Sequence, residues 1–194
     1  IIEDIAYKEA ANGAGSAGAH SGGRMRFGPD RFLYVTTGDN HNATLPQDLK
    51  RLGGKVLRVN RDGQAAPGNN TPAGGDPRIF TYGHRNVQGM AIHPETGDLW
   101  ANEHGPQGGD ELNLIQAGKN YGWPVVTLGR EYSGDPITPV WYREGMEQPV
   151  TVWVPSIAVS GMMFYTGDRL PDWKGDLFVG GLSGLQLHRI VFAS

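Results

Sequence analysis

The sequence predicts an all-β protein built from repeated antiparallel strands, and three observations lead to this prediction. The 194 residues include 30 glycines and 13 prolines, which fall between short apolar runs and are far more than a helical bundle tolerates. Hydrophobic residues make up 38% of the chain and charged residues 19%, enough to bury a core. Within the apolar runs, apolar and polar residues alternate with the two-residue period of a half-buried strand.

The same strand pattern recurs along the chain. Hairpins of strand, polar turn and strand are predicted at residues 25–39, 90–104 and 162–181. Single alternating strands are predicted at residues 55–60, 78–82, 111–115 and 185–191. Two Gly- and Pro-rich stretches without alternation, 64–76 and 129–149, are predicted to be loops between strands.

Repeated antiparallel units of a few dozen residues indicate a β-propeller, in which each blade is a four-stranded sheet of about 40 to 50 residues. At that rate the chain covers about four blades. We predict a single β-propeller domain over residues 1–194.

Composition and charge exclude other classes. The net charge of −3 and the scattered 17 Lys and Arg residues give no basic surface for nucleic acid. No apolar run approaches the roughly 20 residues of a membrane span. Residues 1–10 lack the basic start and apolar stretch of a signal peptide. The absence of cysteine fits an oxidising or a reducing compartment equally well.

Five short polar motifs lie at predicted strand ends. They are HSGGR at 20–24, TGD at 37–39, GHRN at 83–86, EHGP at 103–106 and NYGWP at 120–124. In this order, with Asp110 and Glu111 after the fourth motif, they resemble the soluble glucose/sorbosone dehydrogenases, quinoproteins that oxidise aldose sugars. The resemblance runs over nearly the whole chain.

This resemblance implies a six-bladed propeller that binds pyrroloquinoline quinone (PQQ) and calcium. It also implies an aldose substrate, an external electron acceptor and a periplasmic or secreted location. The propeller of that family is longer than this chain, so the chain is expected to be truncated at both ends. The fragment alone is then expected to be inactive, with open sheet faces through which copies could form a homo-oligomer.

The resemblance implies catalytic roles for His20, Asp39 and Arg85. His20 would take the proton from the anomeric hydroxyl, a task that suits imidazole, while hydride leaves C1 for the quinone and a lactone forms. The hairpin at 25–39 can return Asp39 toward His20, where the carboxylate would orient the ring. Arg85 would stabilise negative charge on the quinone oxygen. The residues alone leave open a surface-loop histidine, a turn-capping aspartate and an Arg–carboxylate bridge between blades.

Further roles are implied for cofactor and metal contacts. Asn86, Gln88 and His104 would join Arg85 around the quinone. The backbone carbonyls of Gly105 and Pro106 would bind one calcium ion, since calcium accepts backbone oxygens as readily as carboxylates.

A second, structural calcium ion would be held by the Glu111 carboxylate and the Tyr121 carbonyl; a plain acidic residue at a strand start is the open alternative for Glu111. His84 and Trp123 are expected to be structural, Trp123 by packing between blades.

Two other functions remain open at this point. Ser183 stands where relatives often carry a cofactor-contacting lysine, which would suit a non-catalytic binding propeller. A calcium-dependent hydrolase of the lactonase type would need a metal ringed by carboxylate and Asn side chains.

Overall fold

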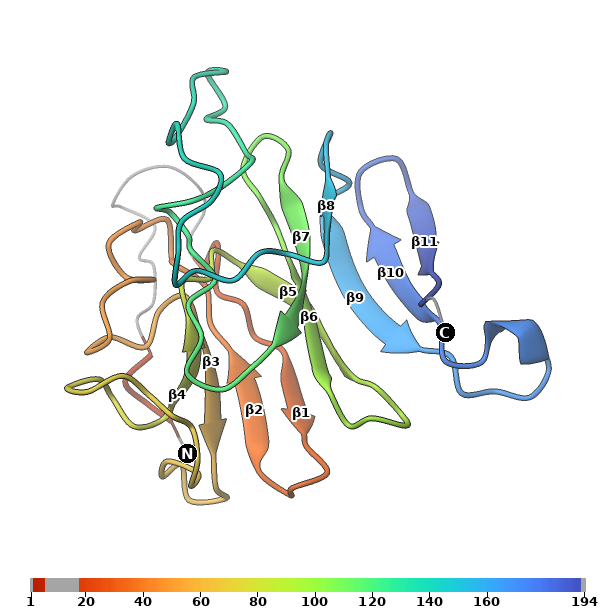
Figure 1. The fold of residues 1–194 in the computed structure, drawn as a ribbon, viewed down its shortest axis with the longest axis horizontal. Coiled ribbons are helices and arrows are strands. Elements are labelled where there is room, and N and C mark those ends of the chain that lie inside the picture. Colours follow the sequence, from red (N-terminus) through yellow and green to blue (C-terminus); the bar gives the residue numbers. More distant parts are fainter. Residues whose placement is uncertain (1, 6–17, 193–194) are drawn as a thin grey trace.

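The computed structural model describes residues 2–5 and 18–192. In that part of the chain the regular structure consists of strands and one short 3-10 helix, η1 (Pro171–Trp173). The strands form three antiparallel sheets that follow one another along the chain and lie side by side (Figure 1). The prediction of an all-β protein is therefore confirmed.

The first sheet has the order β1-β2-β3-β4 and the second the order β5-β6-β7-β8. The third sheet has three strands in the order β11-β10-β9. The strand bounds are β1 (Met25–Phe27), β2 (Leu33–Thr36), β3 (Lys55–Val59), β4 (Ile79–Tyr82), β5 (Val87–Ile92), β6 (Leu99–Glu103), β7 (Asp110–Ile115), β8 (Thr151–Trp153), β9 (Val159–Phe164), β10 (Leu177–Gly181) and β11 (Gln186–Ile190).

The predicted hairpins and single strands all appear in these sheets, whereas β8 was not predicted. Its three residues pair with β7, and so short a strand carries almost no alternation. The chain length suggested about four blades, and the described residues form three sheets. The predicted loops 64–76 and 129–149 are indeed loops. Because a blade count from chain length treats these residues as parts of strands, it gives more blades than there are sheets.

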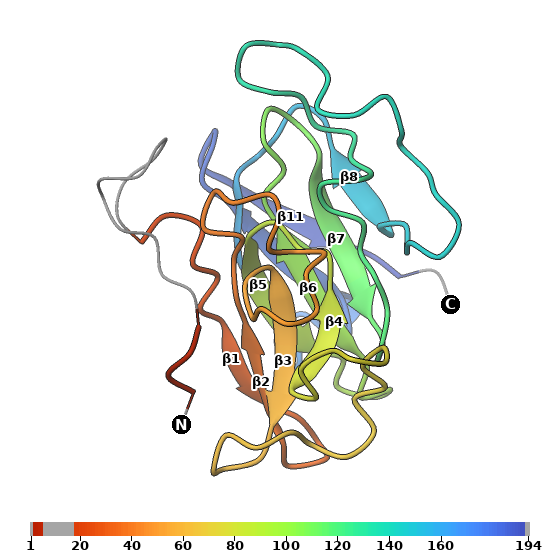
Figure 2. The same ribbon diagram turned by 90° about the vertical axis from the view of Figure 1, so that its left-hand side faces the viewer.

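Apolar side chains fill the spaces between the sheets. Val56, Met90 and Leu99 belong to the cluster between the first and second sheets. Leu112 and Leu177 belong to the cluster between the second and third sheets. Figure 2 shows the first sheet in front of the other two, so the sheets stack face to face around the core.

Antiparallel pairing brings the polar motifs to one end of the sheets. The start of β1 lies beside the end of β2, since Met25 pairs with Val35, and the start of β5 lies beside the end of β6, since Val87 pairs with Glu103. The segments 20–24, 37–39, 83–86 and 103–106 all flank these strand ends. Sheet register alone therefore gathers them into one region.

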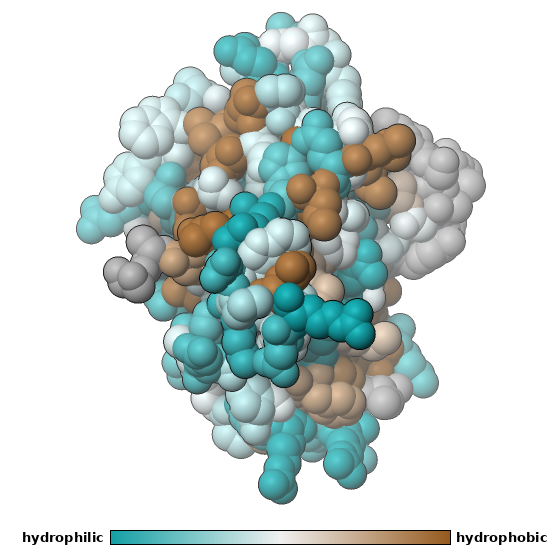
Figure 3. All heavy atoms as spheres, turned by 90° about the vertical axis from the view of Figure 1, so that its right-hand side faces the viewer, coloured by the Kyte–Doolittle hydropathy of each residue, from teal (hydrophilic) through white to brown (hydrophobic). Residues whose placement is uncertain are grey.

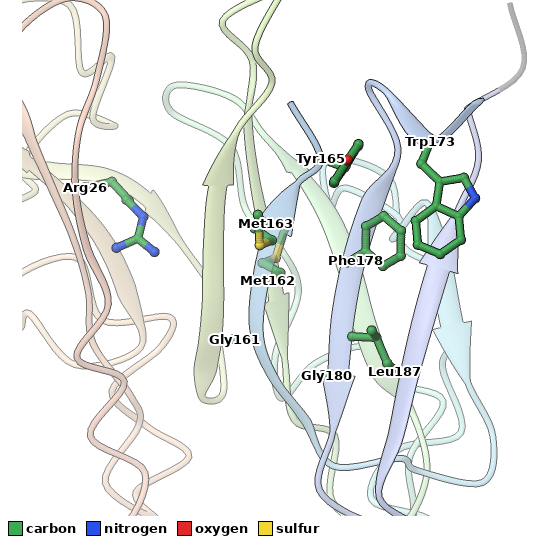
Figure 4. A pocket seen from close by; sticks show the side chains of 9 residues that line it. All are labelled: Arg26, Gly161, Met162, Met163, Tyr165, Trp173, Phe178, Gly180 and Leu187. Carbon is green, nitrogen blue, oxygen red and sulfur yellow. The ribbon is translucent and has the colours of Figure 1, made fainter. Parts of the chain in front are cut away.

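The face of the third sheet turned away from the second sheet carries an apolar hollow of about 570 Å³. Met163, Tyr165, Phe178 and Leu187 line it, and Arg26 of β1 reaches its edge (Figure 4). Figure 3 shows apolar residues gathered in several groups on this side of the molecule. Met163 and Leu187 are 59% and 69% exposed, so this hollow is a distinct, solvent-facing apolar surface.

Candidate active site

The site begins with a hydrogen-bonded pair of His20 and Asp39. Nδ1 of His20 lies 2.7 Å from Oδ1 of Asp39, which is the contact expected from the hairpin. A carboxylate only accepts hydrogen bonds, so Nδ1 carries the proton and Nε2 keeps its lone pair. The His20 side chain is 12% exposed and the Asp39 side chain 3%. The ring therefore offers a basic nitrogen at the edge of a buried carboxylate.

The backbone around this pair is held in an unusual conformation. His20, Asn40 and His41 have φ values of 56°, 52° and 57°, in the left-handed region that non-glycine residues rarely adopt and that concentrates at functional sites. A Cβ atom on Gly38 would lie 1.8 Å from the His20 carbonyl oxygen. Glycine at position 38 thus permits the close approach of the two segments.

The surroundings of Asp39 keep it charged. Burial opposes the charge, but hydrogen bonds from His20 and from the His41 amide, with the nearby charges of His20 and Arg85, hold the pKa of Asp39 below its ordinary value. The His41 ring stacks on the His20 ring with centroids 3.6 Å apart. No pattern in the sequence points to His41, because its stacking on His20 depends on backbone geometry.

Arg85 lies beside this pair. Its backbone carbonyl accepts a hydrogen bond from the Asp39 amide at 2.8 Å, which joins the two loops directly. Its guanidinium donates to the carbonyl oxygens of Gly105 at 3.0 Å and His104 at 3.3 Å. Arg85 therefore connects three of the five motifs.

A buried hydrogen-bond network around Glu103 holds the backbone of Arg85 in place. Glu103 accepts a hydrogen bond from the Arg85 amide at 2.6 Å through Oε2 and pairs with His84 Nδ1 at 2.8 Å through Oε1. His84 Nε2 lies 2.8 Å from Thr81 Oγ1. The structural role expected for His84 is what this packing shows. Glu103 was missed as a supporting residue, because a glutamate ending a strand gives no sign of burial.

Asn86 and Gln88 follow Arg85 in the chain at the start of β5. Asn86 Oδ1 accepts hydrogen bonds from the Gly22 amide at 3.2 Å and from Gln88 Nε2 at 2.8 Å. These contacts orient the two side-chain amides and tie them to the first motif. The cofactor contacts implied for both residues stay predictions.

Trp123 lies in the loop after β7 of the second sheet and contacts the loop after β2 of the first, so it joins two blades, but it does so through polar contacts as well as packing. Its side chain is half-buried, its Nε1 donates to Asp39 Oδ2 at 2.9 Å, and the Arg85 guanidinium carbon lies 5.3 Å from the ring centroid. The indole has a polar edge and a cation-binding face, and both are used here. A sequence argument from flanking Gly and Pro could not reveal this.

His104 points toward the third sheet. Its Nε2 donates to the Val159 carbonyl oxygen, and burial lowers its pKa. Its Nε2 is therefore engaged at the start of β9, and the cofactor contact implied for His104 stays a prediction.

The donors proposed for calcium lie in two neighbouring places. Gly105 presents its carbonyl to Arg85, and a carbonyl oxygen has a second lone pair for an ion. Pro106 is buried. Glu111 lies between two hollows of about 10 Å³ each, one lined also by Gly105 and the other by Tyr121. Such hollows accommodate roughly one water-sized species.

The chemistry of Glu111 fits a cation. Burial and the negative charges of Glu103 and Asp110 raise the pKa of Glu111, so its ionised form lacks a compensating charge. Among residues 2–5 and 18–192 no group of three or more His, Cys, Asp or Glu side chains forms a metal cluster. Calcium here would thus depend on backbone oxygens, as the motifs imply. Asp110 instead binds the protein, because it accepts hydrogen bonds from Gly105, Ser156, Ile157 and Val159.

The residues around Arg85 would form one side of a quinone-binding site. Arg85 supplies a fixed cation, and Asn86 and Gln88 supply amide donors, which suit quinone carbonyl and carboxylate oxygens. The enclosed hollow beside Arg85 is only about 10 Å³. These residues would therefore contact a tricyclic quinone from one side.

Taken together, the consecutive antiparallel sheets and the His–carboxylate pair beside an arginine define a propeller-type protein with a cluster of polar and charged side chains at one end of its blades. Residues 4–194 match the family model described as Glucose / Sorbosone dehydrogenase. The chain belongs to this family.

Named relatives agree with this assignment. The chain is 45% identical over 171 residues to the aldose sugar dehydrogenase YliI of Escherichia coli (strain K12), covering 86% of this chain and 46% of that protein. It is 38% identical over 141 residues to quinoprotein glucose dehydrogenase B of Acinetobacter calcoaceticus, covering 63% of this chain and 29% of that protein.

Solved structures show the same fold. A crystal structure of glucose dehydrogenase superimposes with a TM-score of 0.85 and 41% identity, covering 89% of this chain and 51% of that chain. The PQQ-bound form of aldose sugar dehydrogenase from Streptomyces coelicolor superimposes with a TM-score of 0.69 and 38% identity, covering 90% and 46%. The predicted fold class is confirmed, and the chain spans about half the length of its relatives. No helix among the described residues is long and apolar enough to cross a membrane.

Proposed function

We propose that the protein containing this chain is a PQQ-dependent dehydrogenase that oxidises the C1 hydroxyl of aldose sugars to lactones. The observation that carries the proposal is the His20–Asp39 pair held beside Arg85. A base next to a fixed cation suits a reaction in which a hydroxyl proton leaves while negative charge develops close by. The relatives named above, which include quinoproteins and a PQQ-bound structure, support the choice of cofactor.

His20 removes the proton. Asp39 holds Nδ1–H, so Nε2 accepts the proton of the C1 hydroxyl, and the adjacent carboxylate stabilises the imidazolium that forms. PQQ, when bound, would supply the quinone that oxidises C1 by accepting a hydride, and calcium would supply a Lewis acid, so that the sugar would lose one proton and one hydride and become the lactone. An external electron acceptor would complete the electron balance.

Arg85 and the amides position the partners. The Arg85 guanidinium is fixed by the Gly105 and His104 carbonyls and lies where it can balance negative charge on a neighbouring oxygen. Asn86 and Gln88, joined by a hydrogen bond, would contact the quinone. The carbonyls of Gly105 and Pro106 would bind one calcium ion, and the Glu111 carboxylate with the Tyr121 carbonyl would bind a second, structural ion. A periplasmic or secreted location, as for an enzyme acting on free sugars, is part of the proposal.

The test is reconstitution of the whole protein with PQQ and calcium. Dye reduction is followed with glucose and several other aldoses, with lactone formation measured in the same samples. We expect PQQ-dependent dye reduction coupled to lactone, abolished by a calcium chelator and restored by added calcium. A protein that binds PQQ but oxidises none of the aldoses would refute the proposal, and lactone hydrolysis without dye reduction would indicate the hydrolase alternative.

A further inference from the structure

Trp123 is anchored at its backbone. Its amide donates to the Gly83 carbonyl at 2.9 Å, and its carbonyl accepts from Gln47 Nε2 at 2.8 Å. Gln47 in turn forms a two-way amide pair with Asn120, at 3.1 and 2.8 Å. Trp123 thus has little freedom to move relative to the motif that carries Arg85.

The indole, held in place by these backbone contacts, touches both Asp39 and Arg85. Its edge donates to Asp39 Oδ2 at 2.9 Å, and its face lies 5.3 Å from the Arg85 guanidinium carbon. Asp39 Oδ1 is left for His20 Nδ1 and the His41 amide. A single side chain therefore determines which carboxylate oxygen faces the base and restrains the neighbouring cation.

We propose that Trp123 is a positioning residue for proton abstraction, which acts through Asp39 on His20 and through its ring on Arg85. This inference rests on the proposed function and adds to it a residue that belongs to none of the apolar clusters formed by the described residues. The indole N–H also draws Asp39 charge toward Oδ2 and away from His20.

The effect on His20 follows from that contact. Without the N–H donor, Asp39 Oδ2 loses its hydrogen bond, so the carboxylate no longer holds the His20 ring in one orientation. His41 stacks on the His20 ring, and Arg85 lies beside Asp39. Trp123→Phe leaves all of these in place and keeps an aromatic face for Arg85.

The experiment compares Trp123→Phe with Trp173→Phe, a matched loss of an indole N–H at η1 in the third sheet. In the PQQ- and calcium-loaded whole protein, Trp123→Phe should lower kcat by about tenfold, the loss of one hydrogen bond to a charged group. KM should change less than about threefold. Trp173→Phe should change none of these values.

Two readouts separate positioning from a general loss of structure. In a His20→Ala background, Trp123→Phe should cost less than about twofold, because the residue through which it acts is gone. Full additivity of the two substitutions would overturn the proposal. So would an unchanged kcat in a folded Trp123→Phe protein.

A cofactor-free measurement distinguishes failure of this inference from failure of the proposed function. In the wild-type protein, NMR of ¹⁵N-labelled tryptophan should show one indole N–H resonance that follows the titration of His20 and loses that dependence in His20→Ala. This result would support the contact even if no aldose were oxidised. Indole resonances that are all insensitive to the His20 titration would overturn the inference, including when Trp123→Phe fails to fold.

Discussion

Two His–carboxylate pairs of almost equal length lie on either side of Arg85. His20 and Asp39 are 2.7 Å apart, and His84 and Glu103 are 2.8 Å apart. In both pairs Nδ1 faces the carboxylate. The outer pair leaves its histidine 12% exposed, whereas His84 is 0% exposed.

The two histidines also differ in the partner of their second ring nitrogen, Nε2. His84 Nε2 is bound to Thr81, so both nitrogens of that ring hold strand ends together. His20 is placed in a left-handed loop at the surface of the site, where its Nε2 can reach a substrate. The comparison shows that the two pairs share one contact and differ in burial and in the partner of Nε2, which is why only His20 is proposed to act on a substrate.

Substitution of Glu103 tests the inner pair and should have the largest effect on stability. Glu103→Ala leaves His84 Nδ1 and the Arg85 amide without their acceptor. We expect the free energy of unfolding to fall by about 3 to 5 kcal/mol, measured by urea denaturation of the whole protein. Lys174→Ala, which removes an exposed ion pair with Asp168, is the control and should cost less than about 1 kcal/mol. Equal losses in the two variants would show that the inner pair is not structural.

Substitution of His20 tests the outer pair and should separate activity from stability. His20→Ala should lower turnover by at least about a hundredfold, within the range for a general base, because Nε2 of His20 is the group proposed to accept the hydroxyl proton. PQQ binding should be nearly intact and the free energy of unfolding should change by less than about 1 kcal/mol. Dye reduction and urea denaturation measure the two effects. Near-normal turnover in this variant would show that His20 is not the general base.

The sequence predicted much of this arrangement because strand alternation and motif order are local. The hairpin at 25–39 returns Asp39 to His20 as expected, and the strand before GHRN places Arg85 at its end. What could not be predicted depends on side chains from distant segments. Lys55 starts an alternating strand, yet it is fully buried because its Nζ donates to the carbonyls of Leu45, Pro46 and Gly53. Trp123 likewise meets Asp39 across 84 residues of chain.

Gly38 offers a smaller test of how the outer pair is placed. Gly38→Ala would bring a Cβ atom to 1.8 Å from the His20 carbonyl, so the two loops must separate. We expect a loss of about 1 to 3 kcal/mol in stability and a fall in turnover, since His20 and Asp39 move apart. Gly161→Ala, at an exposed position with nothing within 4 Å of the added atom, is the matched control. If both variants keep wild-type turnover, the close approach of the loops does not position the pair.

Glu111 gives the smallest expected change in the calcium-free protein and extends the comparison to a carboxylate that has no histidine partner. Burial and the charges of Glu103 and Asp110 disfavour its ionised form, so Glu111→Gln removes repulsion while keeping the shape of the side chain. In the presence of a chelator we expect the free energy of unfolding to stay the same or rise by up to about 1 kcal/mol.

With calcium at about a hundred times its dissociation constant, the wild-type protein should gain about 2.7 kcal/mol of unfolding free energy from each ion that binds only the folded state. The Glu111→Gln variant should lose the part of this gain that is contributed at Glu111. Thermal melting with and without calcium measures this difference, and dye reduction should be affected less than melting. An equal calcium-dependent gain in both proteins would show that Glu111 is a buried acid of the strand and not a calcium ligand.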